Sequence, residues 1–561
     1  MPDTASAPVP ERPPRAAATL VVVRDTAEGI EVLLSRRAER GDHNSGAWVF
    51  PGGLVDPGDR AAHPFCAGLN DASTSARLGL DEGGLDYFVA AVRECFEESG
   101  LLFASDTSGE LVRLDDAGDA GAALRSWRTS LHHHERAIGD LCRELGLRLA
   151  VDRLHYLSHW LTPPGRLKRF DTRFFIAVAP PAQTAAFDGT EMVEQQWLRP
   201  AEAVAHSSDL KLLTPTRKTL ELIGRHASVE ALLAWAGSQR TVTLTMPRIA
   251  TGSRGAQPVT PDEPAYAEIG RLDPERAGTA CYDIQPGVGV RLSPRLIRVT
   301  ANNGSMMTGP GTNTYLVGGG AANEWAAIDP GPLDDRHVEA VLAAAPGPIR
   351  WVFVTHTHHD HSPATVMLAA RTGAAVLGCL PDHPEWQDAS FTPGTRLVGG
   401  ERFALTDGAT LRAIHTPGHA SNHLCYLLEE ERLLFTGDHV MQASTVVINP
   451  PDGDMAAYMD SLQSLTELDL DWLAPGHGFL MAAPREAMES IIAHRLAREA
   501  KVLAAVRDIG PASAEALLTR VYADVPLRLH PMALRSLTAH LLKLRRDGAV
   551  ADTDAGWAST A

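Results

Sequence analysis

The chain has 561 residues, of which 44% are hydrophobic and 21% charged, the balance of a folded globular protein rather than a disordered one. At roughly 150 residues per domain, this length predicts three or four domains. The net charge of −18 excludes a surface built throughout to bind polyanions. No apolar run reaches the ~18–20 residues that cross a bilayer. The six cysteines are widely spaced, which is typical of free thiols in a reducing compartment, so we expect a cytoplasmic protein without a membrane partner.

The first half of the chain has the pattern of an α/β domain. Residues 1–14 are rich in proline and lack the apolar core of a signal peptide, so they are predicted to form a disordered tail. Hydrophobic patterning then predicts strands at 17–23, 29–35 and 48–50, helices at about 85–98 and 121–146, strands at 169–179 and 194–198, and helices within about 215–237.

The second half repeats the α/β alternation with different motifs. Residues 246–264 are rich in Gly, Pro, Ser and Thr and are predicted to belong to a linker. Strands and helices alternate again from about 285 to about 485, after which three helical segments and a short tail with the pattern of a β-wing follow. Because the two halves share no motif, the chain is a fusion rather than a duplication.

A cluster of metal-ligand residue types, THTHHDHSPA at 355–364, directly follows the apolar strand IRWVFV. His356 and His358 are two residues apart, so in an extended chain they point the same way and can share one metal. Asp360 and His361 fall on the next turn and can serve a second metal. Imidazole and carboxylate groups are the usual ligands of catalytic zinc, so the loop predicts a metal centre.

Further ligand-type residues follow short hydrophobic strands beside Gly or Pro: His419 in HTPGHASNH, Asp438 in FTGDH and His477 in LAPGHG. Asp329 in AIDPG repeats the arrangement. These five motifs, in this order, resemble the metallo-β-lactamase superfamily. The resemblance implies an αββα sandwich and a metal-dependent hydrolase.

The resemblance also implies a ligand set. It places one metal on His356, His358 and His419, a second on Asp360, His361 and His477, Asp438 between the two, and Asp329 behind them. It implies two zinc ions and a metal-bound hydroxide at neutral pH that hydrolyses an ester or thioester, with Asp360 orienting the water or relaying its proton. His423 is left open between a packing residue and a substrate contact.

The sequences MTGPGTNTYLVG (307–318) and LHPMALRSLTAHLLKLRRDGAV (529–550) are similar to the β-lactamase-like protein 2 family, whose tail is a small winged-helix-like domain. Residues 491–550 contain ten Lys and Arg residues and five Asp and Glu residues, so this range is locally basic. One interpretation is a basic face that packs the domain or a homo-oligomer. The other is a guide for single-stranded nucleic acid, since this family includes an RNA endonuclease. Tyr522 is the one aromatic residue of this range that could stack a base, and this scarcity counts against the second interpretation.

In the first half, RECFEESG at 93–100 matches the second part of the Nudix signature, R-E-U-x-E-E-x-G-U. Glu94, Glu97 and Glu98 are three and four residues apart, so on a helix they share one face. Three crowded carboxylates predict a Mg²⁺ or Mn²⁺ site, and a solvated acidic helix face is the less favoured alternative for this match alone. The upstream FPGG at 50–53 favours the metal site.

The spacing of this signature is unusual. Arg93 follows Gly53 by 40 residues rather than 14, so about 26 residues are inserted, and Asp59 replaces the first Glu. An uninterrupted alternative starts at Gly79, but Leu85 then replaces that Glu. An interrupted box resembles the coenzyme A diphosphatase-like Nudix group, an α/β/α sandwich.

That resemblance implies water attack on a diphosphate. Arg93 orients the glutamates, Glu94 takes part in the chemistry, and Glu94, Glu97 and Glu98 hold the ions. Glu191 or Glu194 is an additional ligand or base, or equally a surface acid.

Together the two resemblances predict a multidomain α/β hydrolase with two metal sites. The expected parts are a tail (1–14), a Nudix domain (15–245), a linker (246–284), a metallo-β-lactamase domain (285–485) and a winged-helix-like domain (486–561). The first site would cleave a diphosphate in a small nucleotide-type molecule, CoA or acyl-CoA being favoured, and the second an ester or thioester. Two alternatives stay open: a single-stranded RNA endonuclease with an accessory Nudix half, and a Nudix half that is a ligand sensor. The sequence identifies no substrate-binding residues.

Overall fold

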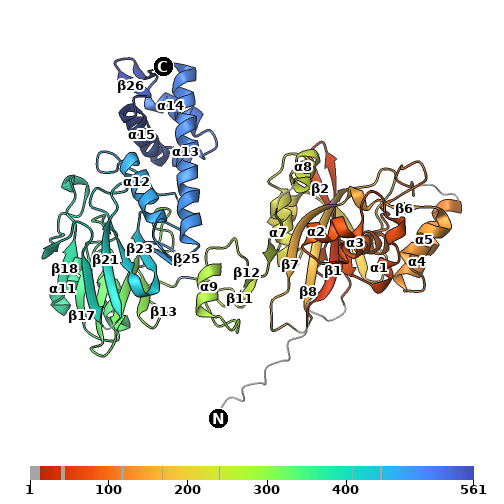
Figure 1. Ribbon diagram of the computed structural model, residues 1–561, viewed down its shortest axis with the longest axis horizontal. Helices are drawn as coiled ribbons and strands as arrows, with labels where there is room; N and C mark the ends of the chain where they lie inside the picture. The colour runs from red at the N-terminus through yellow and green to blue at the C-terminus, as the bar shows by residue number, and fades with distance from the viewer. Residues whose placement is uncertain are drawn as a thin grey trace, which may run out of the picture. The chain divides into compact units, whose positions relative to one another are not determined.

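The computed structural model describes residues 13–39, 44–114, 119–166, 168–238, 241–406, 408–442 and 445–560 (Figure 1). All but the last two residues of the predicted tail, 1–14, lie outside the described residues. The chain divides into two compact units, Met1–Ile249 and Ala250–Ala561. Within the described residues, no helix combines the length and the apolar character that a membrane crossing requires.

The first unit is built on an eight-stranded mixed sheet in the order β10-β7-β8-β1-β2-β3, with β4 paired to β1 and β9 to β2. At its centre β1 runs parallel to β8, and Val23 lies opposite Val178. The strands are β1 (Arg15–Thr26), β2 (Gly29–Arg37), β3 (Trp48–Val49), β4 (Gly52–Leu54), β7 (His155–Leu161), β8 (Phe170–Val178), β9 (Met192–Leu198) and β10 (Leu244–Thr245), while β5 (Ala104–Ser105) pairs with β6 (Arg148–Leu149).

Both faces of this sheet are covered, which explains why β1 reads as a continuous apolar run. Leu20 and Val22 pack against the helix α3, whereas Val21 and Val23 pack against α6, α7 and α8 on the opposite face. The helices are α1 (Pro57–Arg60), η1 (His63–Phe65), α2 (Asp71–Leu78), α3 (Gly84–Ser99), α4 (Asp119–His132), α5 (Ile138–Leu145), η2 (Val151–Arg153), α6 (Pro200–Ala205), α7 (Thr214–Ile223) and α8 (Val229–Gly237). The α/β/α sandwich is confirmed.

One helical prediction in this unit is wrong in detail. The helix expected over 121–146 is two helices, α4 and α5, because the chain turns at His134, whose φ is +55°. A positive φ ends an α-helix, and α5 begins only after Ala137.

The second unit packs two sheets face to face. Seven strands run in the order β13 to β19 and six in the order β20 to β25, with a shared core that includes Tyr315 and Phe353 from the first sheet and Tyr426 and Phe435 from the second. The strands are β13 (Gly289–Ser293), β14 (Leu296–Thr300), β15 (Asn313–Gly319), β16 (Glu324–Ile328), β17 (Ile349–Phe353), β18 (Ala375–Gly378), β19 (Thr395–Arg396), β20 (Arg402–Thr406), β21 (Ala409–His415), β22 (Leu424–Leu428), β23 (Leu433–Gly437), β24 (Trp472–Pro475) and β25 (Met481–Ala482).

Helices cover the outer face of each sheet. Val338 and Leu368, on α10 (Asp335–Ala344) and α11 (Thr365–Thr372), pack on the first sheet. Leu462 and Met488, on α12 (Met455–Thr466) and α13 (Pro484–Ile509), pack on the second. This confirms the predicted αββα sandwich. Short 3₁₀ turns are η3 (Pro384–Trp386) and η4 (Glu429–Glu431).

The C-terminal part has its own small core, which includes Val506, Leu517 and Leu541. It consists of the end of α13, then α14 (Ala514–Val521), η5 (Leu527–Leu529), α15 (His530–Arg546) and the hairpin of β26 (Val550–Thr553) and β27 (Gly556–Ser559). Three helices and a β-wing are the predicted elements.

The segment expected to be a linker, 246–284, has regular structure. It contains the strand pair β11 (Arg248–Ala250) and β12 (Gln257–Val259), then α9 (Tyr266–Leu272), around a core of small and branched apolar side chains. The Gly and Pro content predicted the turns correctly but hid these apolar positions. From Ala250 onward the segment belongs to the second unit.

Candidate metal centres

The loop after β17 carries the four clustered residues and is held by Asp329, which follows β16. The backbone N–H of Thr355 donates to Asp329 Oδ1 (2.7 Å), and the Thr355 hydroxyl donates to Oδ2 (2.8 Å). His361 Nδ1 also lies 2.9 Å from Asp329 Oδ2. Asp329 is buried, with φ at +51°. One carboxylate therefore sets both the start of the loop and the ring of His361.

Three imidazoles form the first group of ligand-type atoms. His358 Nδ1 lies 3.0 Å from His356 Nε2 and 3.0 Å from His419 Nε2. His419 Nδ1 donates to the carbonyl of Val447 (2.8 Å), so its Nε2 presents a lone pair to the group. Burial lowers the pKa of His356 well below its usual range and that of His358 to about 3, which keeps both rings neutral.

Two histidines and two carboxylates form the second group. Asp438 Oδ1 lies 3.3 Å from His361 Nε2 and 3.2 Å from His477 Nε2, and Asp360 Oδ2 lies 3.6 and 3.4 Å from the same nitrogens. Burial disfavours the charged form of His361, but Asp360, Asp438 and Asp329 outweigh it and raise the His361 pKa. Burial likewise opposes the charge of Asp438, yet His477 and His361 hold its pKa low.

The donor chemistry of both groups fits divalent cations. In each group the ligand-type atoms lie within 4.8 Å of one another. Among the described residues, none forms a hydrogen bond to His361 Nε2, His477 Nε2 or Asp438 Oδ1, although all three atoms are buried. His477 Nδ1 donates to the Gly311 carbonyl (3.2 Å), so Nε2 is the ring nitrogen that faces the second group. Asp438 Oδ2 lies 3.7 Å from His419 Nε2, so this carboxylate reaches both groups.

A glycine next to a ligand is required by space. A Cβ on Gly476 would lie 2.7 Å from Asp438 Oδ1 and 2.8 Å from His361 Cε1. The Gly beside His477 therefore keeps side-chain atoms out of the second group. His423 lies behind the first group, fully buried, with Nδ1 2.9 Å from the Thr416 hydroxyl. This burial favours a packing role over contact with a substrate.

In the first unit, the two parts of the interrupted signature meet. The N–H of Gly52 on β4 donates to Glu98 Oε2 (2.9 Å), and a Cβ on Gly53 would lie 2.5 Å from the Glu94 carboxyl group. The inserted residues form α1, η1 and α2, and Gly79 ends α2 with φ at +68°.

Arg93 is the centre of this site. Its Nε donates to Asp59 Oδ1 (2.8 Å), its Nη1 to Glu94 (2.8 Å) and Glu97 (3.3 Å), and its Nη2 to the Leu54 carbonyl (2.8 Å). Burial opposes the charge of Arg93, but its hydrogen bond to Asp59 and the neighbouring carboxylates raise its pKa. Burial raises the pKa of Glu94 to about 7.

The three glutamates share one helix face but do not converge as the histidines do. Among the described residues, both groups of ligand-type atoms that converge within 4.8 Å lie in the second unit. Burial raises the pKa of Glu97 and Glu98, with a further rise from the charge of Asp59 at Glu97 and of Glu94 at Glu98, and a smaller one from Glu191 at both. Glu194 instead pairs with Arg36 (2.8 Å).

In the C-terminal region, many of the basic side chains predicted from the sequence are neutralised by neighbouring carboxylates or buried. Arg495 is buried and donates to the Val446 carbonyl. Most of the other basic side chains pair with carboxylates: Arg498 and Lys501 with Asp524, Arg520 with Asp508, Lys543 with Glu499 and Asp547, Arg545 with Asp552, and Arg546 with Asp454. Asp454 and Asp552 lie outside residues 491–550, so the charge balance of that range does not include these two carboxylates.

Comparison with protein families matches residues 82–222 to the NUDT19 Nudix domain, 307–477 to the metallo-beta-lactamase superfamily and 513–557 to the beta-lactamase associated winged helix domain. An atrochrysone carboxyl ACP thioesterase of Aspergillus chevalieri is 33% identical over 275 residues, which cover 46% of this chain and 84% of that protein. A beta-lactamase-like protein 2 homolog of Caenorhabditis elegans is 31% identical, with 46% and 87% covered. The crystal structure of a NUDIX hydrolase from Alicyclobacillus acidocaldarius aligns with a TM-score of 0.34 at 25% identity, over 41% of this chain and 97% of that one.

Because relatives above 30% identity are matched over more than four fifths of their length, the chain belongs to the metallo-β-lactamase superfamily of hydrolases, with a NUDT19-type Nudix domain before the hydrolase and a winged helix after it.

Proposed function

We propose that the second unit hydrolyses a thioester and that the first unit cleaves a diphosphate linkage in a nucleoside diphosphate derivative, CoA or acyl-CoA being the favoured substrate. The observation that carries the first part is the position of Asp438, whose two oxygens face two separate groups of imidazole nitrogens. The relative named as an acyl carrier protein thioesterase supports a thioester over other esters. An acyl-CoA would serve both units, which gives the fusion a common substrate.

In the second unit, we propose that one zinc ion is bound by His356, His358 and His419. A second zinc ion would be bound by Asp360, His361 and His477, with Asp438 between the two groups. Bound cations would lower the pKa of a water molecule and polarise the carbonyl of the substrate. Asp360 is the ligand-type carboxylate with the greater exposure, 27% against 10% for Asp438, and accepts a long hydrogen bond from Thr312 (3.4 Å). It can therefore orient a water molecule or take its proton, whereas Asp438 is confined between histidines.

In the first unit, we propose that Glu94, Glu97 and Glu98 bind Mg²⁺ or Mn²⁺, with Glu191 as an additional ligand or base. Arg93 positions these groups, because one guanidinium bonds both Glu94 and Glu97 while Asp59 holds its other edge. The Glu94 carboxyl group lies against the backbone of Gly53, where a side chain would displace it. The Nudix domain is proposed to span 15–245 and the winged helix 486–561. The metallo-β-lactamase domain, proposed to span 285–485, would also include 250–284.

The test is to identify the products formed from an acyl-CoA by mass spectrometry, with Zn²⁺ and Mg²⁺ supplied. Wild type should yield free fatty acid with CoA, and also adenosine 3′,5′-bisphosphate with acyl-phosphopantetheine. His358→Ala should abolish the first pair only, and Glu97→Gln the second only. His359→Ala is the matched control in the ligand loop, since His359 is exposed and belongs to neither group. If wild type yields neither pair, the acyl-CoA proposal fails.

The alternative of a single-stranded RNA endonuclease is weakened by the ion pairs of the C-terminal region. RNA binding through phosphates would require free cations there and would fall steeply with salt. Titration with labelled single-stranded RNA at low and high salt decides between the two. Tight, salt-sensitive binding together with RNA cleavage lost in His358→Ala would replace the thioesterase assignment.

A further inference from the structure

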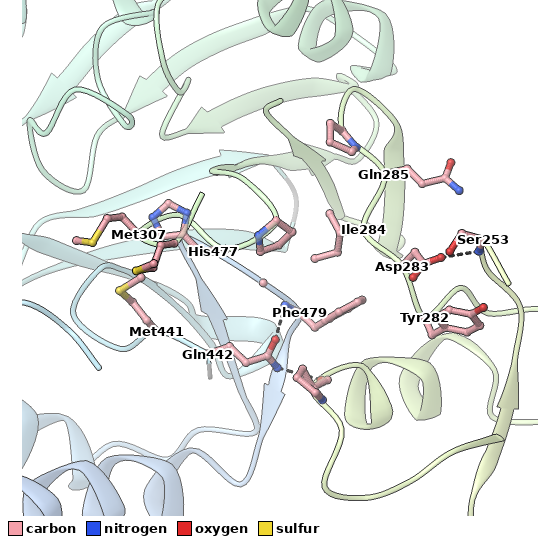
Figure 2. Close-up of a pocket in the computed structure, with 16 residues that line it drawn as sticks. Ser253, Tyr282, Asp283, Ile284, Gln285, Met307, Met441, Gln442, His477 and Phe479 are labelled. Carbon is pink, nitrogen blue, oxygen red and sulfur yellow. Dashed lines mark hydrogen bonds between the residues drawn. The ribbon is translucent and has the colours of Figure 1, made fainter. Parts of the chain in front are cut away.

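A cavity of about 730 Å³ opens beside His477, within the second unit (Figure 2). Its wall is largely apolar: Ile284, Met306, Met307, Met441 and Phe479 contribute, together with three prolines. None of the described lining residues is Lys or Arg, and the carboxylate in the lining, Asp283, accepts a hydrogen bond from the Ser253 N–H (2.5 Å). Figure 2 shows Met307 and Met441 beside His477, and Tyr282 and Ser253 at the opposite end of the group.

One side of this cavity comes from the segment expected to be a linker. Ser253, Pro264 and residues 282–286 line it, and they lie before residue 307, where the match to the metallo-beta-lactamase superfamily begins. Nothing in that match accounts for this wall. The segment therefore lines a cavity that reaches His477, in addition to joining two parts of the chain.

The segment is fastened to the chain that follows His477. Gln442 Nε2 donates to the Pro264 carbonyl (3.0 Å), while Gln442 Oε1 accepts from the Phe479 N–H (2.8 Å). Glu268 on α9 forms a buried pair with Arg298, with contacts of 2.6 and 2.9 Å, and also accepts from the Leu480 N–H (2.8 Å). Two separate hydrogen-bonded links thus hold this wall to residues two and three positions after His477.

The lining specifies the chemistry of an occupant. Met306 and Met307 are 65% and 44% exposed, and unbranched thioether side chains adapt to apolar groups of varied shape. Because the described lining includes no Lys or Arg, the cavity lacks the side chains that pair most strongly with a phosphate or a nucleic acid backbone. A cavity of this size falls in the range of small-ligand sites. An uncharged, flexible apolar chain satisfies all three properties.

We propose that this cavity binds the acyl chain of the thioester substrate and that the segment 250–286 sets which acyl lengths the second unit accepts. The inference rests on the proposed thioester hydrolysis and names the group that the site selects. The carbonyl carbon would lie at the His477 end, and the chain would run past Phe479 toward Ile284. Ile284 is then a specificity-determining residue contributed from outside the matched superfamily region.

The test uses substitutions of opposite sign at Ile284. In wild type, kcat/KM for dodecanoyl-CoA should exceed that for acetyl-CoA by at least tenfold, since each buried methylene adds about fourfold in affinity. Ile284→Trp should lower dodecanoyl hydrolysis at least tenfold with acetyl hydrolysis within about threefold of wild type. Ile284→Ala should shift the preferred chain to greater length. Val398→Trp, at an exposed position of the same unit outside the lining, is the control and should keep the wild-type profile.

A binding measurement separates failure of this inference from failure of the proposed function. Calorimetry with non-hydrolysable ethyl and dodecyl thioether analogues of acyl-CoA should show tighter dodecyl binding in wild type, and the difference should shrink in Ile284→Trp. Chain-length-dependent binding without hydrolysis of either ester would overturn the thioesterase assignment alone. Equal binding of both analogues by wild type, or an unchanged profile in both Ile284 variants, would overturn the acyl pocket.

Discussion

The two units arrange their charged groups in opposite ways. In the second unit, ligand-type residues from four strand ends converge, and one buried carboxylate and two carbonyl groups hold the outward ring nitrogens of three of the histidines. In the first unit, three glutamates of a single helix are held by Arg93 and by the N–H of Gly52. The first arrangement fixes the atoms that face the centre, whereas the second neutralises part of the charge with an internal cation. The comparison indicates that folding alone pre-forms the histidine site of the second unit. In the first unit, Arg93 instead balances part of the negative charge of the glutamates.

The largest effect is expected at the carboxylate that reaches both histidine groups. Asp438→Asn keeps the shape of the side chain but removes the charge between two groups, so thioester hydrolysis should fall by roughly 10⁴-fold. Metal analysis by mass spectrometry should show fewer than two equivalents of zinc. Diphosphate cleavage should stay at the wild-type rate, because Asp438 lies in the other unit. Full zinc content with unimpaired hydrolysis would show that the two groups act independently.

The corresponding change in the first unit is Arg93→Lys, which keeps the charge but loses the fork of N–H donors. A lysine cannot bond Asp59, Glu94 and Glu97 at once, so diphosphate cleavage should fall by about 10²–10³-fold, with thioester hydrolysis unchanged. The control is Arg143→Lys, because Arg143 forms an exposed ion pair with Asp140 in the same unit. Unchanged diphosphate cleavage in Arg93→Lys would mean that the cation only balances charge and does not position the glutamates.

A pH effect on stability is expected behind the histidine site. His337 Nε2 lies 2.8 Å from the Thr314 hydroxyl, which itself donates to the Asp329 carbonyl (2.7 Å). Burial lowers the pKa of His337 to about 4. Since the unfolded value is near 6.5, the stabilisation is complete above pH 6.5 and is lost as the pH falls toward 4, by about 3 kcal/mol.

Urea unfolding between pH 7 and 4, followed by a probe of the second unit, measures this effect. His337→Gln retains a donor for Thr314 and cannot be protonated, so its midpoint should depend less on pH. The groups that face His337 include Asp334, whose charge raises the His337 pKa and opposes the burial effect. Equal pH dependence in wild type and His337→Gln would assign the acid sensitivity to other groups.

Motif order predicted both sandwiches through the family resemblances and identified the ligand-type residues after each strand, because apolar strands followed by ligand types are local signals. The signals failed where a partner is distant in sequence. The acid partners of Arg545 and Arg546 lie at Asp552 and Asp454, outside the window that was counted. The cavity wall around Ile284 was hidden because Gly- and Pro-rich composition resembles a linker, and no local pattern marks the anchor of Glu268 on Arg298. The Arg93–Asp59 pair was foreseeable only through the interrupted signature.

The smallest effect is expected from a substitution at Asp329. This substitution should weaken zinc binding in one of the two ligand groups and not in the other. Asn tolerates a φ of +51°, so Asp329→Asn should keep the backbone and the bond from the Thr355 N–H. If the new amide nitrogen replaces Oδ2, it faces His361 Nδ1 donor to donor and no longer fixes that ring. Zinc affinity of the group containing His361 should fall 10–100-fold, and that of the group containing His356 should not change. Titration against a competing chelator resolves the two binding steps. An equal loss in both steps would show that Asp329 supports the whole loop rather than one ligand.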